Sequence, residues 1–504
     1  MIQTLLLTTI VFCGTDAVEA TRAFRRVHGA EIIEEFAVLL STPNVADDGP
    51  NIRRNAEYLA QAFRARGVDI DVHELPGAPP LVVGSLTVPG ATRTIGIYAH
   101  YDGQPVDPER WSNPPWTPTL YTAAIEAGGV RRPLPGPDEP IDPEWRLYAR
   151  GSGDDKAPIV ALLAALDAFR AGGITPTSNF VFLFEGEEEA GSPHLGAYFD
   201  AHAAQLQADV WLICDGPVHQ SRRPQIVFGV RGITACEITV YGADRFLHSG
   251  HYGNWAPNPA MMLARLLASM KDEAGRVTID GFYDDVVPLS DGDRAALATI
   301  PDVDDELKVE FGLAATERPG LSLGEALMLP SLNVRGLSAG TVGPTARNVI
   351  APTATVSLDI RLVKGNDPRR MLDLLEAHVR RQGYTIVREP PDRRTRLAHP
   401  KIARIVRGGG YRASRAPADL PIVPLLVDAA RLASGGEDVI LMPTMGGSLP
   451  LYLFEDKLGA PTIIVPIANH DNNQHAPDEN LRIANLWYAM DLMAAILTLE
   501  EDAP

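Results

Sequence analysis

The sequence predicts an α/β protein in which a mostly parallel sheet is interrupted by a second, α+β unit. In the first and last parts of the chain, strand-like apolar stretches alternate with helical patterns, which is typical of a parallel sheet. Residues 226–241 and 354–363 instead alternate apolar and polar positions, as half-exposed antiparallel strands do. We therefore expect a first domain of residues 22–225 and 395–504, with residues 226–394 inserted as a second domain.

The length and bulk composition agree with a globular protein of two domains. The 504 residues exceed what one ordinary core organises, so two domains are expected. The formal net charge of -19 makes nucleic acid and anionic membranes unlikely partners. The three cysteines form no C-x-x-C pair, which argues against a disulfide framework and a thiolate zinc site. No run approaches the roughly 20 apolar residues of a membrane span.

The first twenty residues bear on the compartment. Residues 1–13 are largely apolar, and Val18-Glu19-Ala20 loosely matches a signal-peptidase site. No Lys or Arg precedes the apolar run, however, which is unlike a signal peptide. We expect a cytoplasmic protein; secretion or a periplasmic location is the alternative if residues 1–20 are a signal peptide.

In the first domain, apolar periodicity separates helices from strands. Residues 51–66 place Ile52, Leu59 and Phe63 on one face, as an amphipathic helix does. The strands are short apolar runs bounded by Pro and Gly. The elements expected in order are helix 31–40, helix 51–66, strands 68–72, 81–88 and 94–99, helix 159–169, strand 180–185 and strand 209–213.

A glycine turn at residues 151–156 precedes the apolar helix 159–169. Such a turn is a candidate phosphate or dinucleotide cradle. Neither G-x-G-x-x-G nor G-x-x-x-x-G-K is present, so that interpretation is set aside.

The second unit is expected to carry two helices and one irregular insertion. Helical patterns lie at residues 259–270 and 368–382, and an acidic, loop-rich insertion lies at residues 280–320. From Ile402 the pattern of the first domain is expected to resume. The elements expected there are helix 423–433, strands 438–442 and 462–466, and a closing helix at 480–499.

Three consecutive glutamates, Glu187 to Glu189, follow the buried strand 180–185. Carboxylates this close shift each other's pKa, and bound cations would relieve their repulsion. A solvated acidic turn is the plain alternative for this run alone. Other stretches, however, supply matching ligand types.

We expect five potential metal ligands, each at the end of a strand. They are His100, Asp154, Glu189, Asp215 and His475. Two histidines and three carboxylates suit zinc, with cobalt or manganese as weaker competitors. Two metals about 3.5–4 Å apart, bridged by one carboxylate, could hold a hydrolytic water. Asp102, two residues after His100, could accept the ring N–H and fix the tautomer.

At this point the sequence resembles the co-catalytic zinc metallopeptidases, which include carnosinase-type dipeptidases, glutamate carboxypeptidase, acetylornithine deacetylase and succinyl-diaminopimelate desuccinylase. The resemblance runs from about residue 25 to the end. The motifs that carry it are His100-Tyr101-Asp102-Gly103, Gly151 to Lys156, Glu187 to Ser192, Cys214-Asp215-Gly216 and His475-Ala476-Pro477-Asp478-Glu479.

The resemblance implies a role for each residue of this set. His100 and Asp215 would bind one metal, Glu189 and His475 the other, and Asp154 would bridge the two. Glu188 would be the general base and Asp102 the orienting carboxylate. The family usually has Lys-Gly after its bridging aspartate, whereas this chain has Lys156-Ala157. That departure removes no ligand.

The second unit resembles the family's ferredoxin-like lid and dimerisation domain, in the carnosinase branch. The motifs are Leu247 to Gly250, Gly281 to Val286, Asn348-Val349-Ile350, Ile360 to Val363 and Gly446-Gly447-Ser448. By resemblance, four residues would contact substrate: His248, Asn348, Arg361 and Ser448, with Gly447 beside the last. His399 is a further candidate. Arg361 as a solvated strand residue and Asn348 as a turn residue are the structural alternatives.

The resemblance thus implies a homodimeric, two-domain metallopeptidase that cleaves dipeptides or short peptides. His248 would reach across the dimer interface to polarise the scissile carbonyl. An N-acyl amino acid deacylase of the same family is the nearest alternative. A non-catalytic binding homologue is the other, but every expected ligand and the base are present.

Overall fold

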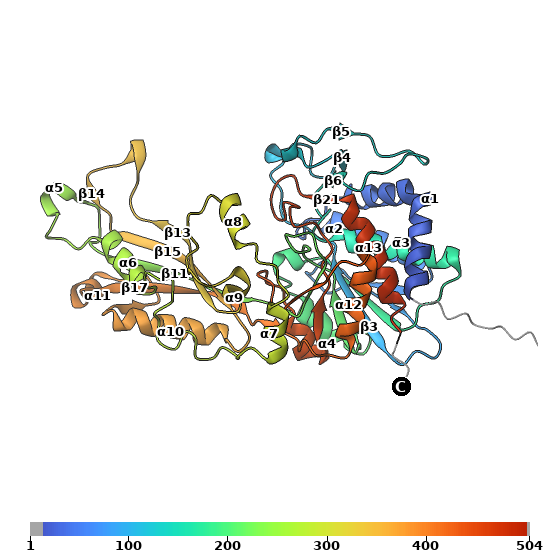
Figure 1. Cartoon of the computed structure of the whole chain (residues 1–504). Helices are drawn as coiled ribbons and strands as arrows, with labels where there is room; N and C mark the ends of the chain where they lie inside the picture. The colour runs from blue at the N-terminus through green and yellow to red at the C-terminus, as the bar shows by residue number, and fades with distance from the viewer. Residues whose placement is uncertain (1–13, 501–504) are drawn as a thin grey trace, which may run out of the picture.

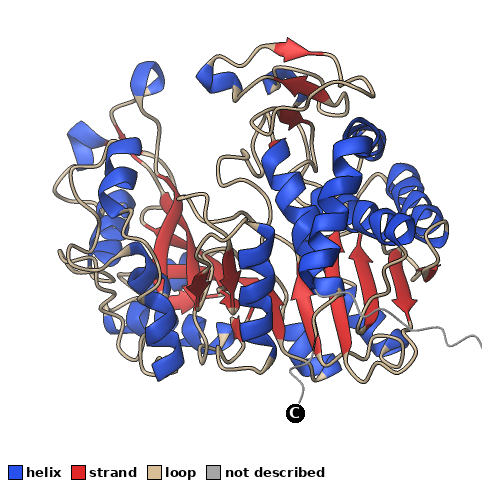
Figure 2. Ribbon diagram, turned by 45° about the vertical axis from the view of Figure 1, so that its right-hand side comes forward, coloured by secondary structure: helices blue, strands red, loops and turns tan. Residues whose placement is uncertain are grey.

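A computed structural model describes residues 14–500 of the chain (Figures 1 and 2). Within this range it contains an eight-stranded main sheet, a five-stranded lid sheet and three smaller sheets. The main sheet and its helices lie at one end of the molecule, and the lid sheet with its own helices lies at the other (Figure 1).

The main sheet is mixed, with most neighbouring strands parallel. Its strands, in spatial order, are β1 (Asp69–His73), β2 (Leu81–Leu86), β7 (Asn179–Glu185), β3 (Thr94–His100), β8 (Val210–Ile213), β20 (Thr462–Ile464), β9 (Gln225–Val227) and β19 (Ile440–Met442). The central neighbours β7, β3, β8 and β20 are all parallel, whereas β1 and β2 add an antiparallel edge. This confirms the predicted fold class.

Helices cover both faces of the main sheet. They are α1 (Gly14–Leu40), α2 (Gly49–Arg64), α3 (Lys156–Gly172), α4 (Leu195–His202), α12 (Ile422–Ala433) and α13 (Ile483–Leu497), with the π-helical turn η5 (Phe454–Leu458). The side chains of α4 and η5 share a core cluster on one face, and those of the other five helices share the cluster on the opposite face. Both faces of the central strands are therefore buried.

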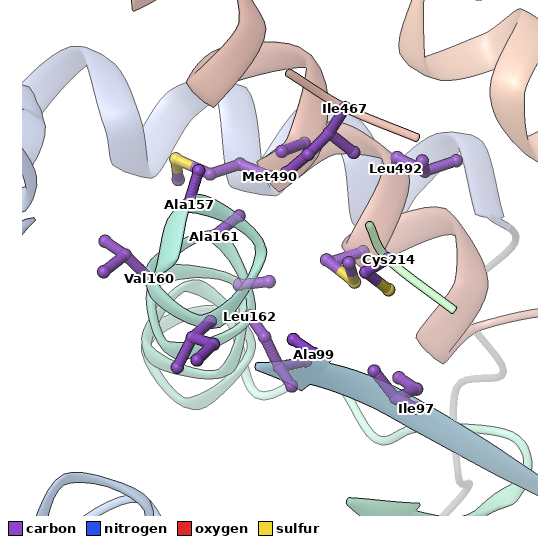
Figure 3. Packing of buried hydrophobic residues seen from close by; sticks show 14 of the residues in the cluster. Ile97, Ala99, Ala157, Val160, Ala161, Leu162, Cys214, Ile467, Met490 and Leu492 are labelled. Carbon is purple, nitrogen blue, oxygen red and sulfur yellow. The ribbon is translucent and has the colours of Figure 1, made fainter. Parts of the chain in front are cut away.

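Helix α3 is enclosed in the core along most of its length. Its small residues Ala157 and Ala161 are fully buried, so neighbouring helices approach its backbone closely. Met490 of α13 lies on one side of α3 and Ala99 of β3 on another (Figure 3). The helix thereby fixes the glycine turn that precedes it against the carboxyl ends of the strands.

Helix α1 is much longer than the predicted helix 31–40. Ala17 and Val18 are fully buried in the core. Asp491 of α13 accepts hydrogen bonds from Arg22 (2.7 Å) and Arg25 (2.8 Å). The apolar residues 1–13, which were considered as part of a possible signal peptide, lie outside the described residues. Among residues 14–500, no helix combines the length and apolarity needed to cross a membrane.

A four-stranded sheet that was not predicted extends from the main domain. Its strands are β21 (Asn480–Arg482), β6 (Arg146–Tyr148), β4 (Thr119–Tyr121) and β5 (Arg131–Arg132), with the short helices η1 (Pro108–Arg110) and η2 (Ile125–Ala127) in its loops. The predicted closing helix at 480–499 was therefore wrong in its first turn. Asn480 to Arg482 pair with β6 instead, and α13 begins at Ile483.

The lid sheet is antiparallel except at one edge and is backed by two helices. Its strands, in spatial order, are β13 (Ser331–Ser338), β15 (Thr353–Leu362), β11 (Gly232–Tyr241), β17 (Ile402–Tyr411) and β16 (Thr385–Val387). The helices are α6 (Pro259–Ala268) and α10 (Pro368–Arg381). A second apolar core lies between them and the sheet.

Smaller elements complete the lid. At its far end lie β12 (Leu247–His248), α5 (Ser249–Tyr252), η4 (Gly343–Thr345), β14 (Val349–Ile350) and α11 (Arg393–Ala398). The insertion at residues 280–320 forms α7 (Asp291–Leu297) and α8 (Asp304–Glu310), and α9 (Leu323–Leu327) follows it. These three helices lie where the lid meets the main domain (Figure 1).

The chain changes sheets at points that differ from the predicted boundaries. The expected strand 226–241 is divided, because β9 joins the main sheet and only β11 belongs to the lid sheet. Likewise the main pattern does not resume at Ile402, since β17 pairs with β11. Strand periodicity is the same in both sheets, so it could not show where the chain crosses.

Two short strands mark the crossings. They are β10 (Gly229–Val230) and β18 (Ser414–Arg415), which pair antiparallel. A Cβ on Gly229 would lie 2.0 Å from the Ser414 carbonyl oxygen, so this close approach requires glycine. The lid is therefore joined to the main domain by two adjacent chain segments.

Candidate active site

The predicted ligands gather at the carboxyl edge of the main sheet. Strand β3 ends at His100, which is in register with Glu185 at the end of β7. The neighbouring strand β8 ends just before Asp215. Parallel strands bring their carboxyl ends to one edge, where such sheets bind ligands.

Six side chains form two groups, each with its ligand atoms within 4.8 Å of one another. The groups are His100, Glu188 and Asp215, and Asp154, Glu189 and His475. The Asp154 carboxylate lies between them: Oδ1 is 2.9 Å from His100 Nε2, and Oδ2 is 3.1 Å from His475 Nε2. Asp154 thus occupies the position expected of a bridging carboxylate.

Asp102 holds His100 and the two neighbouring glutamates in position. One carboxylate oxygen lies 3.3 Å from His100 Nδ1. The same carboxylate accepts the backbone N–H groups of Glu188 (3.1 Å) and Glu189 (3.0 Å). Asp102 is completely buried, so it fixes both the histidine ring and the turn η3 (Glu188–Ala190), from which both glutamates project.

Glu479 holds the bridging aspartate in place. Its buried carboxylate accepts N–H groups from Gly153 (2.9 Å) and Asp154 (3.0 Å), and it is paired with Arg150 at 2.7 Å. Because His475 lies four residues earlier, one carboxylate links the loop of Asp154 to the loop of His475. The motif around His475 thus supplies both a ligand and its support.

The charges of the site perturb one another's pKa values. Burial raises the pKa of Glu188 well above its usual range, and burial together with Asp154 raises the pKa of Asp215 to about 7. For Asp154, burial acts to raise the pKa, but hydrogen bonds from His100 and His475 outweigh it and lower the pKa. Hydrogen bonds to Asp154 and Glu189 raise the pKa of His475 to about 10. Several buried carboxylates crowded together in this way would also be stabilised by bound divalent cations.

The donor set fits two such ions. Imidazole nitrogen and carboxylate oxygen are the donors that zinc takes in hydrolytic sites. Glu189 Oε1 is buried and has no hydrogen-bond partner among residues 14–500. A buried carboxylate oxygen is costly to leave unpaired, and a metal ion would satisfy it.

From the lid side, Arg361 reaches the edge of the site. Its Nη1 donates to Ser448 Oγ at 2.8 Å. Gly447 and Ser448 line a cavity of about 320 Å³ together with Glu188 and His475. Three of the predicted substrate contacts, Arg361, Gly447 and Ser448, are therefore brought to the ligand groups.

The other lid candidates lie elsewhere. His248 and Asn348 are neighbours, because Ser249 N–H donates to the Asn348 carbonyl at 2.9 Å, and both are exposed. Their elements, α5 and β14, lie at the end of the lid farthest from the main sheet (Figure 1). His399 is also exposed and follows α11 at that same end. One chain alone does not bring these three residues to the ligand groups.

Three polar side chains in the site were not anticipated. Gln104 donates to Glu189 Oε2 and Gln474 to Asp154 Oδ2, both at 2.8 Å. Tyr411 donates its hydroxyl to the Ser448 carbonyl at 2.9 Å. The two glutamines stand within two residues of predicted site residues, which could have indicated them. Nothing in the sequence links Tyr411 to the site.

A family model described as peptidase family M20/M25/M40 matches residues 96–499. Among curated proteins, the Cys-Gly metallodipeptidase DUG1 of Candida albicans is 26% identical over 477 residues, covering 90% of this chain and 91% of that protein. The Beta-Ala-His dipeptidase of Homo sapiens is 25% identical over 455 residues, covering 86% and 80%.

Solved structures show the same architecture. An M20 family metallo-carboxypeptidase of Sulfolobus solfataricus, Sso-CP2, aligns with a TM-score of 0.74 at 27% identity, covering 93% of this chain and 99% of that one. Human carnosine dipeptidase 1 aligns with a TM-score of 0.69 at 21% identity, covering 95% and 99%. The predicted arrangement of a main domain with a separate lid is thereby confirmed at the level of the fold.

Proposed function

We propose that this chain, which belongs to peptidase family M20/M25/M40, is a metal-dependent dipeptidase. The observation that carries the proposal is the pair of ligand groups linked through Asp154, in which Glu188 of the first group lines a cavity. Relatives along most of the chain are named as dipeptidases. Residues at the lid boundary suit a small substrate with a free carboxylate.

The ligand groups support a proposal for the metal positions. His100 and Asp215 would hold one ion, Glu189 and His475 the other, and Asp154 would be shared. We propose zinc as the resident metal, with cobalt and manganese as competitors for the same donors. When bound, the two ions would lower the pKa of a water and polarise the scissile carbonyl.

Glu188 is the proposed general base. Its side chain is 11% exposed and lies 3.9 Å from His100 Nε2, whereas Glu189 is 4% exposed and lies 3.1 Å from His475. The more accessible glutamate lines the cavity, so it can take a proton from water there and return it to the leaving amine. Asp102 keeps that side chain in place by holding its backbone N–H.

Arg361 and Ser448 are proposed to bind the carboxylate at the C-terminal end of the dipeptide. A guanidinium fork matches a carboxylate in geometry and charge. The hydrogen bond from Arg361 to Ser448 holds the guanidinium beside a residue that lines the catalytic cavity. The half-buried serine hydroxyl would add a second donor.

We also propose a homodimer in which each lid completes the partner's active site. His248 and Asn348 are exposed at the far end of the lid, where they cannot serve their own site. Strand β13 is the edge of the lid sheet and exposes Val334 and Leu337. Such an edge is a template for pairing with another copy. In this arrangement, His248 of the partner subunit would donate to the developing oxyanion.

A cytoplasmic location is proposed as well. Ala17 and Val18 are packed in the core, so cleavage after Ala20 would remove buried parts of α1. Cell fractionation of the native organism tests this, and recovery of a shortened chain outside the cytoplasm would contradict it.

Metal removal tests the central proposal. Dialysis against a chelator should abolish release of amino acids from a dipeptide panel, and added zinc, cobalt or manganese should restore it. Metal content should be measured in the same samples. Full activity in a preparation shown to be metal-free would contradict the mechanism.

A further inference from the structure

A large cavity adjoins the proposed catalytic site on the side of the insertion. Its volume is about 1050 Å³, and it is lined from both the main domain and α7 and α9. Pro217 and Met445 line this cavity and the smaller catalytic cavity alike. The two spaces therefore meet just beyond Asp215, and the large one has no part in the metal chemistry.

The lining of the cavity is mainly aliphatic. Its principal apolar side chains are Leu289, Leu297, Ile300, Leu323, Leu327 and Met442. Ligand sites typically have volumes of about 300–1000 Å³ and combine such a lining with a few placed polar groups. A dipeptide of small residues would leave most of this space unfilled.

Eight polar side chains also line the cavity, and two of them, Gln225 and His219, are buried. Gln225 is 5% exposed, donates its amide to the Pro217 carbonyl at 2.7 Å, and leaves a buried Oε1 with no partner among the described residues. His219 Nδ1 accepts the Ser221 N–H at 3.1 Å, so the neutral ring carries its proton on Nε2. Burial, reinforced by Arg223, lowers the pKa of His219 to about 4, which keeps the ring neutral. The cavity wall therefore presents two uncharged polar side chains: the amide of Gln225, whose oxygen is an acceptor left unpaired within residues 14–500, and the neutral imidazole of His219.

We propose that this cavity is a substrate subsite for an apolar group on the carbonyl side of the scissile bond. The apolar group would be a bulky side chain of the N-terminal residue or the chain of an acyl amide. This inference rests on the proposed function, and it names the substrate class of that site.

The positions of the proposed anchor and of the junction between the two cavities indicate which side of the bond is meant. Ser448, which accepts the hydrogen bond from Arg361 in the proposed carboxylate anchor, lines the catalytic cavity but not the large one. The large cavity shares Pro217 with the catalytic cavity, two residues after the ligand Asp215. A substrate that is anchored by its carboxylate at Ser448 and has its scissile carbonyl at the metal ligands would therefore direct its acyl half toward Pro217.

Two substrate series distinguish the sources of the apolar group. One series is Ala-Gly, Leu-Gly and Phe-Gly, and the other is acetyl-, hexanoyl- and decanoyl-glycine. Each buried methylene should raise kcat/KM by about fourfold, from its transfer free energy. A rise in the first series alone assigns an apolar residue, and a rise in the second alone assigns an acyl chain. Flat responses in both series would overturn the proposal.

Variants that fill the cavity provide the structural test. Ala298→Trp places an indole in the cavity from an exposed position after α7. It should cancel the gain from larger groups and leave Ala-Gly hydrolysis unchanged. Leu323→Trp does the same from α9 and serves if the first variant folds poorly. Ala295→Trp is the matched control, because that exposed position of α7 does not line the cavity.

A binding measurement separates this proposal from the proposed function. In Glu188→Gln, which should not turn over, titration calorimetry compares acetyl-glycine with decanoyl-glycine and Ala-Gly with Phe-Gly. Tighter binding of the larger member of either pair, lost in Ala298→Trp, supports the subsite even if no substrate is hydrolysed. Equal affinities within both pairs would overturn it, even in an active dipeptidase.

Discussion

The carboxyl edge of the main sheet and the far end of the lid contribute to one proposed active site but are built very differently. At the sheet edge, His100 and Asp102 are completely buried and hydrogen-bonded to neighbouring side chains and backbone. At the lid end, His248 is exposed, and its ring accepts a hydrogen bond only from Gly250 two residues away, among the contacts of the described chain.

This difference distinguishes the groups that are positioned when one chain folds from the groups that are positioned only when two chains associate. Buried, mutually bonded groups are held in position by folding alone. An exposed histidine on a two-stranded ribbon keeps its side-chain freedom, so ordering it costs entropy that a partner surface must offset. The metal groups should therefore form in any folded chain, whereas the oxyanion donor should depend on dimerisation.

The largest effect is expected inside the sheet edge, where adjacent glutamates have different roles. Glu188→Ala should retain metal and lower kcat by about 10²–10⁴-fold, the usual contribution of a general base. Glu189→Ala should instead lose metal. Metal analysis beside kinetics checks both variants, and the reverse pattern would exchange the two assignments.

Stability should distinguish the two regions as well. Glu479→Gln leaves Arg150 charged and buried, so it should lower the free energy of unfolding by about 3–5 kcal/mol. Asn348→Ala at the exposed lid end should change it by less than about 0.5 kcal/mol. Urea unfolding at fixed metal concentration measures both. Equal losses would mean that the lid end is more tightly ordered than its exposure indicates.

The dependence on a partner is tested most directly at His248. His248→Ala should lower kcat by about 10²–10³-fold with metal content intact, as expected for loss of one oxyanion donor. Refolding this variant together with Glu188→Ala should give mixed dimers in which one site is complete. Recovered activity supports donation across the interface. Mixed dimers that stay inactive would assign His248 to its own subunit or to no catalytic role.

Arg361 lies between the two regions and should have a smaller effect. A hydrogen bond to a charged group contributes about 1.5–3 kcal/mol, so amidating the C-terminus of a good dipeptide should raise KM by about 10–100-fold. Steady-state kinetics on the acid and the amide measure this. An unchanged KM would make Arg361 a structural partner of Ser448 and favour an aminopeptidase-like substrate.

Much of the site could be predicted because each ligand lies at the end of an apolar strand or in a loop with a distinctive motif. His100 is the last residue of β3 and Asp215 comes two residues after β8, and parallel pairing brings such strand ends together. The position of the Asp154 carboxylate between the two histidines could not be predicted from sequence spacing. That position depends on Glu479, more than 300 residues away, whose carboxylate accepts the Asp154 N–H.

The lid and its junction were less predictable for a different reason. Alternating strands look alike whichever sheet they join, so β9 and β17 could be placed only by their hydrogen-bonded partners. The large cavity was equally hidden, because its walls come from α7, α9 and the distant Met442. Apolar residues in a loop-rich insertion do not reveal whether they line a space or fill one.

The antiparallel pair β10 and β18 makes the lid a removable module. Val230 is paired with Ser414, and partners in an antiparallel pair have Cα atoms only about 4.5–5.5 Å apart. A two-residue hairpin turn could therefore join them, deleting the whole lid without stretching the chain that remains. The excised segment would also have adjacent ends, so two copies could be fused head to tail. The same geometry would let a lid from one relative be transplanted onto the main domain of another.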